Sequence, residues 1–392
     1  MSVETALFNR RDLLAPFAKK RKTETPPSRI SKIGSKLTQP QPPKRGKEGI
    51  SRRYFIGGGL VLTAGVASGI LKPWDWFTSK PEQSKPESLE SLITQAKKME
   101  DEYKDQNLSN KAIREKFADL LAGIFSLHYP EYFSRKQLEE TTSWSDTLDH
   151  FVRQRMASAG KTGIPTATQL ENERGTSAMT DNRRRKITVN AAADVFQQRT
   201  IVASRNIPKG WNPLKMLCIS LLHEFNHLVS ESTDELIFSI IDPSNQYKDK
   251  RIEGFRFIGI DQAGGYAVSF NDLHESVVEL LAKDISLSDF GSHLSDMPSE
   301  TPGITMDVII NNLEQVLRVI NMSHQELAKL HKSSNIREFL LILANKAGAS
   351  SAIPLEDKIK FGSRIVRVIL ANDQGILQIY LNSVRSTNPS KN

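Results

Sequence analysis

The chain has 392 residues, and its 53 Lys and Arg exceed its 45 Asp and Glu to give a net charge of +8. Residues 1–54 hold 14 of the basic and 4 of the acidic side chains, so the other residues, with 39 and 41, carry a net charge of −2. Because the positive charge is confined to this segment, the composition does not indicate a nucleic-acid-binding core. We expect residues 1–54 to form a disordered basic tail that binds no nucleic acid, because the segment shows no regular interleaving of aromatic residues with its charges.

An uncharged segment follows the tail. Residues 55–71 contain no charged side chain, and the aromatic residues Trp74, Trp76 and Phe77 come directly after them. This length is at the low end for a membrane span, and the aromatic cluster is typical of a membrane interface. The preceding Ser51-Arg52-Arg53-Tyr54-Phe55-Ile56 resembles the twin-arginine pattern of bacterial export signals.

These features predict one topology. Residues 55–77 are expected to form a single-pass membrane anchor with residues 1–54 in the cytoplasm and the remaining chain outside it, since basic flanks stay on the cytoplasmic side. If the signal is cleaved, the protein is exported instead. A buried core helix is the alternative interpretation. Residues 78–88 are then a linker, and residues 89–392 form one domain.

The first half of this domain is predicted to be largely helical. Residues 88–128 have helical periodicity with a break near 107–110, and residues 145–156 form a further helix. Residues 158–185 are polar and lack a clear period, so they are expected to form a loop. The alternating segment 186–190 is a strand candidate.

The sequence His223-Glu224-Phe225-Asn226-His227 carries most of the functional information. It lies in an apolar stretch without Gly or Pro from Leu214 onward, which predicts a long, largely buried helix. On a helix, His223 and His227 project from one face and can bind one zinc ion, while Glu224 lies close enough to act on a metal-bound water. Two core histidines bonded to carbonyls are the alternative. Cys218 lies in the same helix and is expected to be a small core residue, so cysteines do not close this site.

A catalytic zinc site needs a third protein ligand. The metzincin pattern would place Gly and His at positions 230 and 233, where this chain has Ser230 and Thr233, so that class is excluded. A second helix, capped by Asn271 or Asp272, offers Glu275 instead.

The sequence from Leu273 to Leu281 (LHESVVELL) resembles the L-N-E-A-x-T-E-x-L segment of the gluzincins, the thermolysin-like class of zinc peptidases. The resemblance implies that Glu275 is a zinc ligand and that Glu279 accepts a hydrogen bond from a zinc-bound histidine, His223 by analogy. The chain departs from the class at His274 and Val278, where Asn and Thr are usual. An ordinary solvated helix face is the alternative for both Glu.

The resemblance covers about residues 186–347. It implies an α+β, mostly α-helical, zincin-like metallopeptidase fold with a small β-sheet and a helical C-terminal subdomain. Residues 251–261 and 266–270 fit two strands joined at Gly264-Gly265, and residues 186–190 fit the edge strand above the zinc to which an extended peptide would pair. Three more helices are expected at 306–320, 324–331 and 336–347. Residues 361–383 form either a hairpin or helices.

The sequence therefore predicts a peptidase with one Zn²⁺ ion that hydrolyses a peptide or protein substrate outside the cytoplasm. The metal would lower the pKa of a bound water toward ~7 and Glu224 would act as general base. Possible donors to the oxyanion are Tyr266, His274, His324 and His331. Two alternatives are a non-catalytic, membrane-anchored envelope protein of the same fold that binds a partner, and a zinc hydrolase of another amide, such as cell-wall peptide.

Overall fold

The computed structural model describes residues 87–104, 106, 108–158, 161–193, 196, 212–241, 247–261, 266–292, 304–349 and 351–387. These residues belong to one compact unit. The tail 1–54, the segment 55–77 and almost all of the linker 78–88 lie outside the described residues. Among the helices that are described, none is long and apolar enough to cross a membrane.

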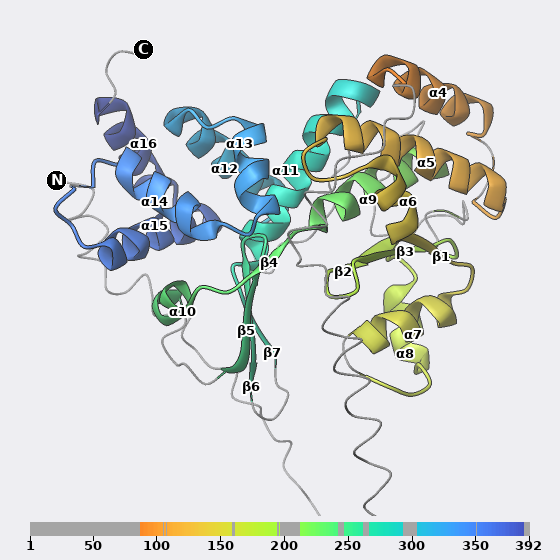
Figure 1. Cartoon of the computed structure of the whole chain (residues 1–392), viewed down its shortest axis with the longest axis horizontal. Helices are drawn as coiled ribbons and strands as arrows, with labels where there is room; N and C mark the ends of the chain where they lie inside the picture. The colour runs from red at the N-terminus through yellow and green to blue at the C-terminus, as the bar shows by residue number, and fades with distance from the viewer. Residues whose placement is uncertain are drawn as a thin grey trace, which may run out of the picture. The chain divides into compact units, whose positions relative to one another are not determined.

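Three helices form the N-terminal layer of this unit: α4 (Leu89–Glu102), α5 (Lys111–His128) and α6 (Arg135–Thr141). The break predicted near 107–110 is confirmed, because Asn110 caps α5 by accepting hydrogen bonds from the backbone N–H groups of Ala112 and Ile113. Helix α5 packs against α4 on one side and against the central helix α9 on the other (Figure 1).

A three-stranded sheet lies next to this layer. It has the order β1-β3-β2, in which β3 (Lys186–Asn190) pairs parallel with β1 (Thr142–Ser145) and antiparallel with β2 (Ala178–Asp181). The strand predicted at 186–190 is confirmed, but its edge position is wrong because β3 lies between two neighbours. Among the described strands, β1 and β2 each have one neighbour and form the two edges, and β2 is the edge strand that packs against α9.

The loop predicted for residues 158–185 is also corrected. Helix α7 (Leu148–Ser158) is followed by the short helix α8 (Ala167–Glu173) and then by β2. Elements of seven and four residues are too short to show periodicity. The one local indication was Thr166, which forms a capping box with Gln169.

Two long helices cross the centre of the unit: α9 (Pro213–His227) and α11 (Asn271–Phe290), which pack against each other (Figure 1). Asn212 caps α9 by accepting a hydrogen bond from the backbone N–H of Lys215, and Pro213 occupies the first turn, where no N–H is needed. The predicted capping of α11 by Asn271 or Asp272 is wrong. Phe270 occupies the cap in a left-handed conformation (φ 61°) and makes no side-chain capping bond.

A four-stranded antiparallel sheet connects α9 to α11. Its order is β4-β5-β6-β7, and the strands span β4 (Glu231–Ser232), β5 (Tyr247–Glu253), β6 (Arg256–Asp261) and β7 (Tyr266–Ser269). The short helix α10 (Glu235–Ile241) lies between β4 and β5 in the chain. The single strand predicted at 251–261 is in fact two strands that reverse at Gly254-Phe255. The predicted Gly264-Gly265 junction lies outside the described residues.

The remaining chain is helical and forms a layer beside α11: α12 (Met306–Ile320), α13 (His324–Lys332), α14 (Ile336–Lys346), α15 (Leu355–Leu370) and α16 (Gln374–Thr387). The three helices predicted here are confirmed within one residue at their ends. The ambiguous segment 361–383 belongs to two helices that meet near Asn372, not to a hairpin. The α+β, mostly helical class is therefore confirmed.

Candidate metal centre

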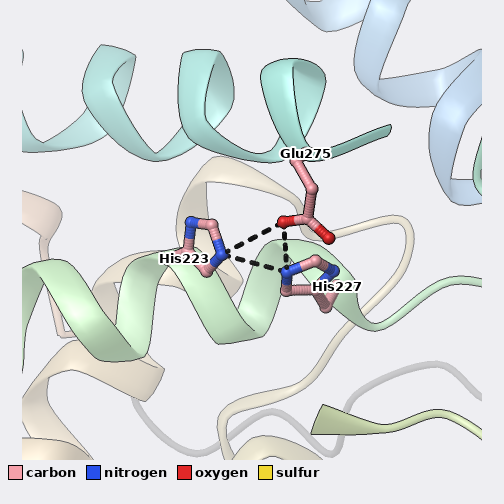
Figure 2. Close-up of side chains that lie close together, drawn as sticks. All are labelled: His223, His227 and Glu275. Atoms are coloured by element: carbon pink, nitrogen blue, oxygen red, sulfur yellow. Dashed lines mark hydrogen bonds and ion pairs between the residues drawn. The ribbon is translucent and has the colours of Figure 1, made fainter. Parts of the chain in front are cut away.

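The structure brings together His223 and His227 from α9 and Glu275 from α11. Figure 2 shows the three side chains pointing toward one another across the two helices. The Nε2 atoms of the two histidines lie 3.0 Å apart, and Oε2 of Glu275 lies 3.6 Å from His223 Nε2 and 3.2 Å from His227 Nε2. Ligands at the zinc bond lengths of a tetrahedral site would be separated by about 3.3 Å, so the spacing fits one tetrahedral ion.

The donor chemistry also fits a metal. Within the described residues, these three form the only group of His, Cys, Asp or Glu side chains close enough to share an ion. Oε2 of Glu275 is buried and, among the described residues, accepts no hydrogen bond of good geometry. Burial would raise the pKa of this carboxyl, but His227, His223 and Arg256 lower it to about 2. A buried anionic oxygen beside two imidazole nitrogens suits a divalent cation.

Glu279 lies one turn beyond Glu275 and contacts the other nitrogen of His223. Its Oε2 is 2.8 Å from His223 Nδ1, and the carboxylate is 2 % exposed. This is the contact predicted from the sequence. Burial lowers the pKa of His223, but the hydrogen bond and charge of Glu279, with Glu224 and Glu275, raise it to about 9. The carboxylate therefore orients the ring so that Nε2 faces Glu275.

His227 has a corresponding partner that the sequence did not predict. Its Nδ1 lies 2.9 Å from Nε2 of His274, and Nδ1 of His274 lies 3.0 Å from Nε2 of His331. His274 and His331 are both fully buried. Burial and the nearby cations hold the pKa of His274 and of His331 well below its usual range, so both are neutral. Two directions of hydrogen bonding are open to this chain, and the backbone N–H of Phe255 also lies 3.4 Å from Nδ1 of His274. The direction in which Nδ1–H of His227 donates to His274 leaves the Nε2 lone pair of His227 free for a metal.

The chain of three histidines excludes two of the residues predicted as possible oxyanion donors. His274 and His331 lie beyond Nδ1 of His227, across the ring from the nitrogen that faces Glu275, so neither can reach a group bound there. His324 lies at the start of α13, where it pairs with Asp284 at 3.3 Å. The side chain of Tyr266 lies outside the described residues.

Gly254 makes the close packing of these histidines possible. It adopts φ +58°, and a Cβ at this position would lie 2.5 Å from His274 Nδ1 and 2.6 Å from His331 Nε2. Any larger residue would therefore displace the two rings and would strain the β5–β6 turn.

Glu224 is held by a residue of the edge strand β2. The hydroxyl of Thr180 lies 2.6 Å from Oε2 of Glu224 and 3.1 Å from its backbone carbonyl oxygen. A hydroxyl donates only one hydrogen bond at a time, and the carboxylate is the stronger acceptor. Among the described residues, no other side chain engages Glu224, so Oε1 is available to a water or substrate.

A cation also borders the site. The NH1 atom of Arg256, the first residue of β6, lies 3.9 Å from Oε1 of Glu275, while its NH2 donates to Glu253 at 2.7 Å. Nothing in the sequence points to this residue, because the pattern of residues 251–261 predicts one strand where the structure has β5 and β6. Thr180 was not predicted either, because its strand β2 lies in the segment that was expected to be a loop.

A separate pocket lies away from this cluster. It opens between β4 and the α13–α14 junction and is lined by residues that include Ser230, Ser232, Asp234, Lys329 and Lys332, but by none of the three potential ligands. The functional assignment therefore depends on the geometry of the donor atoms.

Comparison with known proteins adds no assignment, since the chain matches no protein-family model, no curated protein and no solved structure.

Proposed function

We propose that this protein is a zincin-like, zinc-dependent peptidase in which His223, His227 and Glu275 hold the metal. The observation that carries the proposal is the convergence of three donor atoms from α9 and α11, with Glu224 on the same helix and next to the first histidine. The two-histidine, one-carboxylate set is also used by non-haem iron. The adjacent Glu224 favours zinc and hydrolysis, because an oxygenase does not need a base there.

When bound, zinc would polarise the scissile carbonyl and make a water more acidic. Glu224 takes the proton from the attacking water and then delivers it to the leaving amine. Thr180 binds Oε2 of Glu224 and so directs Oε1 toward the reacting atoms. Glu279 and His274 each bind the Nδ1 of one ligand histidine and fix the orientation of its ring.

The substrate would bind as an extended strand. Strand β2 has a free edge among the described strands and lies against α9 through Thr180, so a peptide paired with this edge would pass Glu224. This role was expected of residues 186–190, and β2 replaces them in the proposal. Membrane anchoring through residues 55–77, with the domain outside the cytoplasm, completes the proposal on the sequence pattern alone.

The test combines metal analysis with peptide cleavage by the purified full chain. We expect one zinc per chain, a sharp loss of zinc in His227→Ala, and cleavage of a mixed peptide library. Glu224→Gln should retain the zinc and lose activity by at least ~10². His150→Ala, an exposed histidine on α7, is the matched control for loss of an imidazole.

Equal zinc in the wild type and His227→Ala would show that the site is misassigned. Zinc binding without cleavage of any amide would favour a non-catalytic envelope protein, whereas cleavage confined to cell-wall peptides would favour that class of substrate.

A further inference from the structure

We propose that Arg256 binds a substrate carboxylate beside the scissile bond, so that the enzyme acts on peptides carrying an acidic group at this position. The inference rests on the proposed peptidase function, because it names the substrate class of the same site. Four features of Arg256 support it: its place, its free hydrogen-bond donor, the local charge, and its offset from the ligand atoms.

Arg256 reaches the site from the turn that packs against the histidine chain. It follows Gly254 and Phe255 directly, and its side chain is 20 % exposed. The conformation of this turn is fixed by Gly254, whose N–H donates to Ser334 at 2.6 Å. The guanidinium is therefore presented by a rigid element, as a recognition residue requires.

One arm of the guanidinium has no hydrogen-bond acceptor. NH2 donates to Glu253, whereas NH1 lies 3.9 Å from Oε1 of Glu275, which is too long for a hydrogen bond. Nε is buried and also has no partner in the described residues. NH1 is thus the nitrogen of Arg256 with N–H groups left for a substrate, and a guanidinium N–H near the centre of a site is suited to a carboxylate.

The charge near Arg256 favours an anion. Glu253, 2 % exposed, is shared between Arg256 and Arg251, each at 2.7 Å, so two cations face one buried carboxylate. Glu231 is the next acid, and it faces Arg183 and Arg185 in addition to Arg251. Glu275 lies 3.9 Å from Arg256 through Oε1 and faces the histidine pair with Oε2. Two guanidinium groups thus share the one buried carboxylate of Glu253.

The position of NH1 separates carboxylate recognition from oxyanion stabilisation. Oε2 of Glu275 faces both histidines, whereas Arg256 lies on the Oε1 side of the same carboxylate. A group bound to NH1 is therefore offset from the atoms between the ligands. This offset suits a neighbouring acidic side chain or a terminal carboxylate of the substrate, and not the reacting carbonyl itself.

The experiment compares matched peptides with the zinc-bound full chain. Library peptides that are cleaved are resynthesised with Glu or Gln at each position flanking the cut, and with a free or amidated C-terminus. We expect the wild type to prefer the carboxylate form by at least ~10-fold in kcat/KM, as for a hydrogen bond between charged groups. The position that shows the preference identifies a side chain or the terminus as its source.

The variant Arg256→Gln should reduce this preference to within about two-fold by slowing only the acidic peptide. Arg256→Lys should retain part of it, because the charge remains. Arg153→Gln, an exposed arginine on α7, is the matched control. Zinc content should equal that of the wild type. An equal loss on acidic and neutral peptides, a loss of zinc, or a wild type indifferent to the carboxylate would each overturn the inference.

A binding measurement separates this inference from the proposed function. Zinc-bound Glu224→Gln is titrated with the Glu and Gln forms of one peptide, or, where no peptide is cleaved, with succinate and succinamide. Tighter binding of the carboxylate form that disappears on adding Arg256→Gln supports the inference even if the wild type cleaves nothing. Cleavage of peptides without any carboxylate-dependent binding supports the proposed function and overturns the role of Arg256.

Discussion

The hydroxyl of Thr180 lies 2.6 Å from Oε2 of Glu224, and this contact connects the edge strand of the first sheet to the helix that carries the potential metal ligands. The two residues are 44 positions apart in the chain. Strand β2 thus has two roles in the proposed enzyme, since it orients the base and offers a backbone edge to a peptide.

Replacing Thr180 tests the first of these roles. Thr180→Val removes the hydroxyl and keeps the shape, so Glu224 should lose its fixed orientation while the zinc stays bound. We expect kcat to fall on the order of tenfold, the usual weight of a hydrogen bond to a charged group, with little change in KM. Thr180→Ser restores the hydroxyl and should restore most of kcat. A fall in KM or in zinc content with unchanged kcat would contradict a role in positioning the base.

Glu279 provides a test of the ligand orientation. Glu279→Ala removes the acceptor at Nδ1 of His223, so the imidazole can rotate and its tautomer is no longer fixed. Zinc affinity should fall by about 10–100-fold, measured by competition with a chromophoric chelator. Glu115→Ala, an exposed glutamate on α5 that pairs only with Lys111 at 3.7 Å, should leave the affinity unchanged. Equal affinities in both variants would show that the contact does not support a metal ligand.

The same pair predicts how zinc binding depends on pH. In the metal-free protein, burial lowers the pKa of His223, but Glu279, Glu224 and Glu275 raise it to about 9, so the imidazole is protonated at neutral pH. A metal must displace this proton. Zinc affinity should therefore rise by up to about tenfold per pH unit below pH 9 and then level off. Glu279→Gln should lower the pKa of His223, so the zinc affinity of this variant should level off at a lower pH than that of the wild type. A pH-independent affinity between 7 and 9 would contradict the protonated state.

The sequence predicted the centre of the site because helical spacing is a local property. His223 and His227 share a face in any helix, and Glu275 and Glu279 are separated by one turn of α11. Thr180 and Arg256 could not be predicted in this way. Each comes from a short strand that reaches the site by packing against a helix, β2 against α9 and β6 against α11, and strands of four and six residues are too short to show a clear period.

His274 shows a different limit. The sequence indicated an imidazole next to Glu275, but helical spacing alone does not show where this imidazole lies relative to the potential metal site. Neighbouring positions on a helix point in directions about 100° apart, so His274 projects away from the face of Glu275. Only the packing of α11 against α9 and α13 shows that His274 lies between His227 and His331.

Lys332 provides the last prediction, because it is buried at the end of α9, the helix that carries the potential ligands His223 and His227. It is 1 % exposed, and its Nζ lies 2.8 Å from the carbonyl oxygen of Asn226 and 3.2 Å from that of Phe225, in the last turn of α9. The rings of Phe125, Tyr129 and Phe133 surround the ammonium at 5.4–5.8 Å. Burial lowers the pKa of Lys332, whereas both carbonyls and the ring faces favour the charged form.

Lys332→Met keeps the aliphatic volume, removes the ammonium donor from the carbonyl oxygen of Asn226, and leaves that of Phe225 with the backbone N–H of Leu228. We expect the free energy of unfolding of the metal-free protein to fall by about 1–3 kcal/mol for the loss of this buried partner, measured by urea denaturation. Zinc affinity should also fall, because His227 is the last residue of α9 and loses the support of its final turn. Lys329→Met, an exposed lysine on the same helix, is the matched control and should change neither quantity. If Lys332→Met is as stable as Lys329→Met, the ammonium does not hold the end of α9, and His227 must be positioned by His274 alone.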